Sequence, residues 1–342
     1  MSSSLTETPF QRQLDELEGR VAHAAGETEQ ALRELVLQAR AADDGLAQGW
    51  ALVILGGALF YQGRFAEVIE QNEQALDLAL RLGNTALESR ALNGLGISRQ
   101  KLGQYAQAFR DYTRSLKLSR ANRDPVAVVR TLSNLAYLYR VHRQFDQAMT
   151  LLTEAQELLI RQRHPRYALS VSGNLAWTHI DAGNYQQALA ITHLFLPEAL
   201  AQPGTKYALQ FHCAQAVCYL HLKCLPEALA CASRAVEEAE RQVEADADAL
   251  SFVTLAEVLM ALREFHRAEE LLLKALHRAN RSGSVMAKVN IKAKLARVYT
   301  SLGDQERAFE YSSLFFETQE RLRDGGSDPL GMIHCPPMSA LK

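Results

Sequence analysis

Residues 131–159 read TLSNLAYLYRVHRQFDQAMTLLTEAQELL, a run of helix-forming residues around one central aromatic. The small residue Ala136 lies nine residues before Phe145, and Ala148 and Ala155 lie three and ten residues after it. Small side chains at matched places on two helices let the helix backbones approach each other closely. The stretch therefore predicts a hairpin of two helices that meet along their small residues.

The same pattern returns at intervals of forty residues. The central aromatic and its equivalents are Phe65, Tyr105, Phe145, Tyr185, Leu225 and Phe265, with Gln305 in the seventh place. In several repeats a glycine such as Gly103 stands two residues earlier, where a left-handed conformation ends the first helix without steric cost. Because one hairpin cannot bury both of its faces, successive hairpins must stack. The sequence therefore predicts an all-α solenoid.

This repeat resembles the tetratricopeptide repeat (TPR). The signature places of that family are filled with its residue types at Leu135, Ala136, Tyr139, Phe145, Ala148 and Ala155. The resemblance covers residues 47–322, and it implies a right-handed superhelical solenoid of antiparallel helix hairpins with a concave groove. The repeat is longer than the family's usual length of about 34 residues. Longer helices of this kind resemble those of TPR proteins in bacterial regulation and signalling.

The repeat pattern divides the chain into three parts. Residues 1–46 hold a weaker copy, which we expect to be a degenerate N-terminal capping repeat. Residues 47–323 hold seven repeats, and residues 324–342 contain Gly and Pro clusters that indicate a flexible tail.

One junction between repeats is irregular. Pro197 lies inside an expected helix, where proline kinks the axis. Gln215 replaces the Leu of the pattern, and Leu225-Pro226 replaces the aromatic turn. These irregularities predict a bend near 197–205, and the competing interpretation is a degenerate repeat without mechanical role.

Composition and charge narrow the classes of function. Of 342 residues 48% are hydrophobic, and the net charge of −2 gives no global positive field for nucleic acid or an anionic membrane. No secretory signal is visible near Met1, and no apolar run is long enough to span a bilayer. Five cysteines, an odd number in a large chain, fit reduced thiols. We therefore expect a cytoplasmic protein that binds neither nucleic acid nor membrane directly.

The side of each first helix that faces away from the hairpin core is unusually basic. Its charged residues are Arg90, Lys101, Arg130, Arg140, Lys294 and Arg297 against the acidic Asp181 and Glu257. The TPR resemblance places this side in the concave groove, and asparagine there can both donate to and accept from an extended peptide backbone. The predicted groove residues are Arg90, Asn93, Arg130, Asn134, Tyr137, Arg140, Asn174 and Trp177. The competing interpretation is an inner face that is merely solvated.

The predicted function is non-enzymatic, because no catalytic motif and no phosphate-binding loop is present. We expect a protein–protein interaction scaffold or regulatory adaptor that binds an extended, acidic peptide or protein segment, without a cofactor. One alternative is a stand-alone sensor of a bacterial signalling or transcription-regulation system that acts on a separate effector chain. Another is an enzyme with an unrecognised site.

Four cysteines and two histidines gather in one repeat, which raises the question of a metal site. Cys213 and His221 stand eight residues apart, about 12 Å along a helix, too far for one tetrahedral ion. Cys218 and Cys231 occupy places where the repeat wants small apolar residues. We expect a structural role and no metal, and redox activity stays open.

The C-terminal end of the array carries an apolar group that no further hairpin can cover. Its members are Leu314, Phe315 and Phe316. They are expected to be capped by the tail, through Leu330, Met332, Ile333 and Leu341, or by a second copy of the chain. The Gly and Pro content of the tail favours self-association as a homodimer through this end.

Overall fold

The computed structural model describes residues 9–21, 24–162, 167–202, 206–241, 249–281 and 285–324. Within these residues the chain forms sixteen α-helices and no strand, which confirms the all-α prediction. The helices are α1 (Pro9–Arg20), α2 (Ala25–Ala41), α3 (Gly45–Tyr61), α4 (Phe65–Leu82), α5 (Thr85–Lys101), α6 (Tyr105–Ala121), α7 (Pro125–Val141), α8 (Phe145–Gln162), α9 (Ala168–Asp181), α10 (Tyr185–Leu200), α11 (Tyr207–His221), α12 (Leu225–Arg241), α13 (Leu250–Ala261), α14 (Phe265–Arg281), α15 (Val285–Leu302) and α16 (Gln305–Asp324).

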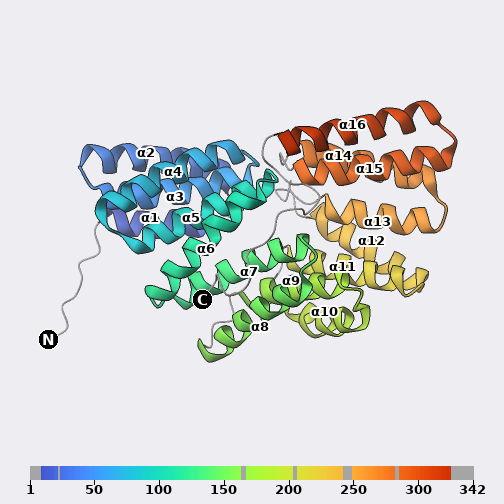
Figure 1. Ribbon diagram of the computed structural model, residues 1–342, viewed down its shortest axis with the longest axis horizontal. Helices are drawn as coiled ribbons and strands as arrows, with labels where there is room; N and C mark the ends of the chain where they lie inside the picture. The colour runs from blue at the N-terminus through green and yellow to red at the C-terminus, as the bar shows by residue number, and fades with distance from the viewer. Residues whose placement is uncertain are drawn as a thin grey trace.

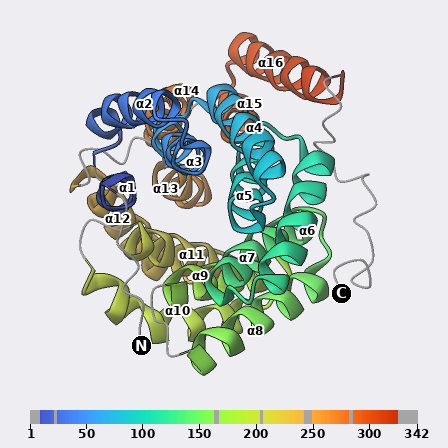
Figure 2. The same cartoon turned by 90° about the vertical axis from the view of Figure 1, so that its left-hand side faces the viewer.

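The helices stack as consecutive hairpins along a superhelix (Figure 1). Viewed along the long axis from the N-terminal side, the path runs clockwise away from the viewer, which makes the superhelix right-handed (Figure 2). The odd-numbered helices α3 to α13 line the inside of the ring, and each contacts the next odd-numbered helix. The fold is the solenoid of helix hairpins that the repeat pattern predicts, with the right-handed superhelix that the TPR resemblance implies.

The ends of the helices follow from local chemistry that repeats with the sequence. Asp44, Asn84 and Asp124, forty residues apart, each accept the backbone N–H three residues further on at 2.9 Å. Such side-chain caps satisfy a backbone donor that the first helical turn leaves without a partner. At the opposite turns, Gly103 has a φ of 79°, and Arg143 takes the same place with a φ of 58°. The left-handed turn predicted from the glycines is therefore confirmed, and it persists where the glycine is absent.

The small residues of the pattern sit where two helices touch. A Cβ atom placed on Gly96 of α5 would lie 2.5 Å from the ring of Tyr112 on α6, which is fully buried. Two further aromatic residues, Phe109 and Tyr139, meet edge to face at 5.6 Å between ring centroids. Together with leucines of α7 and α8 they form one continuous core, here called the α6–α9 cluster.

One contact joins parts of the chain that are far apart in sequence. Met286, at the start of α15, packs against the α6–α9 cluster. In Figure 2 the helices α14 and α15 return to the same angular position as α3 and α4, so the described chain completes about one turn of the superhelix. The Met286 contact therefore bridges successive levels of the superhelix.

The irregular junction is filled by polar side chains. α10 continues through Pro197 to Leu200. Gln215 is buried, and its amide nitrogen lies 3.3 Å from His193 Nδ1. Its Oε1 accepts a weak bond from Cys231 Sγ at 3.8 Å. The polar residue at the place of a leucine is thus satisfied locally, and the bend near 197–205 stays a prediction.

Replacing Pro197 with alanine is expected to raise the free energy of unfolding by about 1–3 kcal/mol. The change restores an N–H that can donate to the carbonyl of His193 and removes the clash of the proline ring. Urea unfolding followed by circular dichroism measures the effect. Pro125→Ala is the matched control, because Pro125 stands at the start of α7, where proline is harmless. Equal gains from both substitutions would contradict a special cost at Pro197.

Candidate peptide-binding groove

Three consecutive inner helices carry all the residues predicted for the groove. α5 carries Arg90 and Asn93, α7 carries Arg130, Asn134, Tyr137 and Arg140, and α9 carries Asn174 and Trp177. Because α5 contacts α7 and α7 contacts α9, the structure brings these residues together on three adjoining inner helices. Asn93 is buried, and the other seven are half-buried.

The amide side chains of two neighbouring helices bond to each other. Asn134 Nδ2 donates to Asn93 Oδ1 at 3.0 Å. Within the described part of the chain, the Asn134 carbonyl and the Asn93 amide nitrogen are left without a partner, as is the whole side-chain amide of Asn174. An extended peptide offers alternating N–H and C=O groups, and these free amide atoms can bond both kinds.

Part of the positive charge predicted for the groove is neutralised by carboxylates of neighbouring inner helices. Arg140 pairs with Asp181 of α9 at 3.1 Å and lies 5.1 Å from the centre of the Tyr137 ring. Burial raises the pKa of Asp181, and the charge of Arg140 partly offsets this shift. Arg90 pairs with Glu18 of α1. The positive excess available to a ligand is therefore smaller than the count of basic residues indicates.

The two basic residues of this set near the C-terminal end differ in their surroundings. Lys294 of α15 pairs with Glu257 of α13, whereas Arg297 is exposed. Near the N-terminal end, the Lys101 ammonium lies 5.9 Å from the centre of the Phe60 ring.

Arg130 differs from every other basic residue of this surface. Its Nε atom is buried without a hydrogen-bond partner. Burial, and secondarily the positive charge of Arg90, lowers the pKa of Arg130 to about 10. A guanidinium nitrogen that is buried without an acceptor is costly unless a ligand supplies one. Arg130 is therefore the basic residue of this surface whose surroundings best fit an anionic ligand.

The two aromatic residues predicted for the groove form parts of its wall. Tyr137 packs against the α6–α9 cluster, and Trp177 packs against the cores on either side of α11. Each is half-buried, so each keeps part of its ring accessible. Such surfaces suit the side chains of a bound peptide.

Glu18 contacts this surface although no sequence pattern pointed to it. It stands in the weak first copy of the repeat and is separated from Arg90 by 72 residues. The acidic residue between Leu17 and Gly19 has no distinguishing motif, and only the path of α1 across α3 brings it to α5. A pairing set by the superhelix cannot be found from local spacing.

Three of the four cysteines in the 212–231 repeat are enclosed. Cys213, Cys218 and Cys231 are buried, whereas Cys224 is half-buried. Burial raises the pKa of Cys218 to about 12 and also raises the pKa of Cys231, which disfavours the reactive thiolate. In the part of the chain that the structure describes, no three His, Cys, Asp or Glu residues gather as metal ligands would. None of the described helices is long and apolar enough to cross a membrane.

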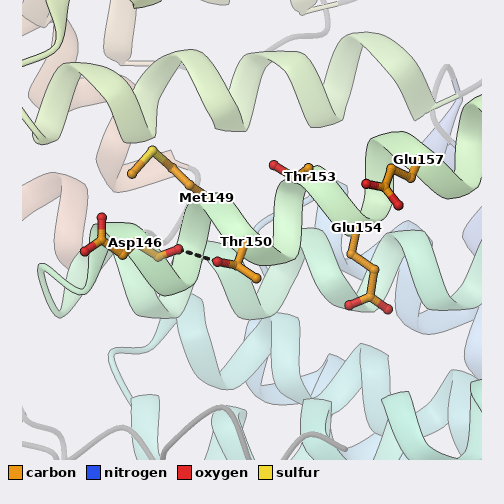
Figure 3. A pocket seen from close by; sticks show the side chains of 6 residues that line it. All are labelled: Asp146, Met149, Thr150, Thr153, Glu154 and Glu157. Carbon is orange, nitrogen blue, oxygen red and sulfur yellow. Dashed lines mark hydrogen bonds between the residues drawn. The ribbon is translucent and has the colours of Figure 1, made fainter.

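A hollow of about 550 Å³ lies on the outer side of the ring along α8. Figure 3 shows its lining, which comes from α8 alone: Asp146, Met149, Thr150, Thr153, Glu154 and Glu157. Thr150 donates to the backbone carbonyl of Asp146 at 2.8 Å, and Glu154 pairs with Arg120 at 2.6 Å. The polar groups of this hollow are largely occupied within the protein, so we assign it no function.

The last helix leaves apolar side chains in solvent. Phe316 is 61% exposed and Phe309, which the sequence analysis did not single out, is 75% exposed. Leu314 and Phe315 are half-buried, and the Phe315 ring meets Phe316 edge to face at 5.3 Å between centroids. The tail residues Leu330, Met332, Ile333 and Leu341 lie outside the described residues.

Comparisons with known proteins agree with this geometry. The tetratricopeptide repeat family model matches residues 47–121 and 87–161. A Rap protein complexed with competence and sporulation factor shares the fold with a TM-score of 0.70 and 13% identity, over 95% of this chain and 89% of that chain. The Rap conjugation gene regulator of plasmid pLS20, in complex with the Phr* peptide, gives 0.65 and 13% over 94% and 98%.

The apo form of the quorum sensor NprR from B. thuringiensis gives a TM-score of 0.62 and 15% identity, over 91% of this chain and 87% of that chain. No curated protein sequence matches the chain. At these identities the solved structures establish the fold rather than the activity. By the family model, residues 47–161 hold tetratricopeptide repeats, and the described helices build a solenoid with the same fold as these solved structures.

Proposed function

We propose that the chain is a non-enzymatic adaptor that holds an extended peptide or protein segment on the inner surface of α5, α7 and α9. The observation that carries this proposal is the set of free amide atoms beside the Asn93–Asn134 bond, with the unpaired Asn174 on the next helix. Aromatic walls at Tyr137 and Trp177 flank these amides. One solved structure with this fold is a complex with competence and sporulation factor, and another is a complex with the Phr* peptide. These complexes support the proposal that the inner surface of this chain binds a peptide.

The double substitution Asn134→Ala, Asn174→Ala is expected to weaken peptide binding. Each side-chain amide that no longer bonds to the peptide should cost about 1–3 kcal/mol of binding free energy. Binding is measured on an array of random heptapeptides, and each peptide that the wild type selects is then titrated in solution. Asn134→Ala also leaves the buried Oδ1 of Asn93 without its donor, so the thermal unfolding midpoint should fall, and binding is measured well below it.

Asn290→Ala is the matched control, because it removes an exposed amide from α15, outside the three helices. The proposal fails if the wild type selects no heptapeptide. It also fails if the double variant binds the selected peptides as tightly as the wild type does.

We also propose that the adaptor works in the cytoplasm and acts on a separate effector chain, as a sensor in a bacterial signalling or transcription-regulation system. The support is the similarity over nearly the whole chain to a quorum sensor and to a conjugation gene regulator. Co-purification of an effector whose amount changes when the selected peptide is added would test this role.

We further propose that two copies of the chain associate through α16. Phe309 and Phe316 lie seven residues apart and so share one face of that helix. The small residues Ser312 and Ser313 lie between them, where a second helix can approach closely. A two-fold axis would place the same face of a second copy against this one.

A further inference from the structure

The charge of Arg130 is not compensated by the protein itself. Besides the hydroxyl of Tyr167, two carboxylates act on it electrostatically, Asp124 and Glu18, and each carboxylate is engaged elsewhere. Asp124 accepts the backbone N–H of Ala127 at 2.9 Å and thereby caps α7. Glu18 is paired with Arg90. Arg130 therefore remains without an acceptor in the described part of the chain, close to a second guanidinium whose charge repels its own.

The surroundings of Arg130 resemble an anion site with one position already filled. Arg90 and Arg130 stand on neighbouring helices, and the bonded pair Asn93 and Asn134 lies one helical turn further along the same two helices. Two guanidiniums match the oxygens of a carboxylate, and amide nitrogens can donate further bonds. The pair of Arg90 with Glu18 shows that Arg90 binds a carboxylate, and in this structure the carboxylate of Glu18 is the group bound to it.

We propose that Arg130 and Arg90 form a binding site for a carboxylate of the peptide ligand, and that Glu18 of α1 is an internal competitor for this site. This inference rests on the proposed function and adds the ligand chemistry and its regulation. The ligand carboxylate pairs with Arg130 and shares Arg90 with Glu18 or displaces Glu18 from it. α1 otherwise packs mainly on α2 and α3, so the pair of Glu18 with Arg90 links it to α5. Displacement of Glu18 by a ligand therefore weakens the attachment of α1 to α5.

The first test uses the heptapeptides that the wild type selects from the array. Arg130→Met is expected to bind them about 10- to 100-fold more weakly, as is typical of a lost charged hydrogen bond. Arg81→Met, which removes an exposed charge from the outer helix α4, should bind like the wild type. Glu18→Gln should bind more tightly than the wild type, because it removes the competing charge. Each peptide is also made with an amidated C-terminus, and separately with its Asp and Glu replaced by Asn and Gln.

The two modified peptides distinguish a terminal carboxylate from a side-chain carboxylate. Amidation of the C-terminus should weaken binding to the wild type if the terminal carboxylate is bound, and replacement of Asp and Glu should do so if a side-chain carboxylate is bound. The effective modification should leave binding to Arg130→Met unchanged. Equal binding of the selected peptides to Arg130→Met and the wild type overturns the carboxylate site. If the Asn134→Ala, Asn174→Ala variant still loses binding in that case, the proposed peptide adaptor stands while the inference about Arg130 falls.

A second test needs no peptide. The Nε–Hε resonance of Arg130, assigned by its loss in Arg130→Met, is followed while glutarate is added at constant ionic strength. Saturable movement is expected in the wild type, with a lower midpoint in Glu18→Gln. A resonance that does not move overturns the site. Arg130→Lys covers the case in which Arg130→Met does not fold. Lysine keeps the positive charge but lacks the planar pair of donors of arginine. The affinity of Arg130→Lys for glutarate or for the selected peptides should therefore be lower than that of the wild type but still measurable.

Discussion

Replacing Tyr139 with alanine is expected to lower the free energy of unfolding by about 3–5 kcal/mol. The Tyr139 side chain is fully buried in α7 at a signature place of the repeat, and its ring packs edge to face on Phe109. Removing it leaves a cavity in the α6–α9 cluster and also removes the aromatic contact. This is the largest loss of stability that we expect from any single change discussed in this chain.

The loss should also change the way the chain unfolds. Each hairpin of a solenoid is stabilised mainly by its two neighbours, so a weakened central repeat divides the array. Urea unfolding of Tyr139→Ala should therefore show two transitions, and hydrogen exchange should be fastest in α7 and α8. Tyr61→Ala is the control, because that tyrosine is 52% exposed in α3. A single, unshifted transition in Tyr139→Ala would contradict the cavity argument.

Replacing Phe309 and Phe316 together with aspartate is expected to convert a dimeric chain into a monomer. Burying these two side chains from each of two copies contributes about 6–12 kcal/mol before the entropic cost of association. Charges placed on the same face would repel each other across a two-fold axis. Sedimentation at micromolar concentration measures the change.

The control for this prediction lies at the other end of the array. Leu37 is a comparably exposed apolar residue, at 64%, on α2, and Leu37→Asp should leave the oligomeric state unchanged. A second comparison removes residues 325–342. If the intact chain is a monomer and the shortened chain associates, the tail covers α16 and the proposed dimer is wrong. If both are soluble monomers, neither cover is needed.

The spacing of the sequence was sufficient for the architecture of the chain. The aromatic at Phe145 and the small residues at Gly96 and Ala148 mark where helices pack within a hairpin and between hairpins. The structure confirms the solenoid that follows from this pattern. Local patterns suffice because each hairpin packs on its neighbours in sequence. The turn at Arg143 takes the same left-handed conformation as the glycine of equivalent repeats, although arginine itself gives no such signal.

The candidate site could be predicted only in part. The repeat pattern placed Asn134 and Arg130 on the inner surface, but it could not say that Asn134 bonds to Asn93 or that Arg90 is paired with Glu18. Both pairings depend on the twist and rise of the superhelix, which accumulate from small angles between many hairpins. The exposed Phe309 was missed for another reason: its place is apolar in most internal repeats, as at Phe109 and Leu189, so an apolar residue there does not signal exposure.

The Met286 contact has a consequence for the order in which the chain folds. Hairpins that pack on their immediate neighbours involve short loops, so they can form rapidly and in the order of synthesis. The contact between α15 and the α6–α9 cluster instead encloses about half of the chain, and its loop-closure entropy has to be overcome last. We therefore expect a nascent chain to hold stacked hairpins before its superhelical turn is closed, with closure awaiting synthesis of the last repeat.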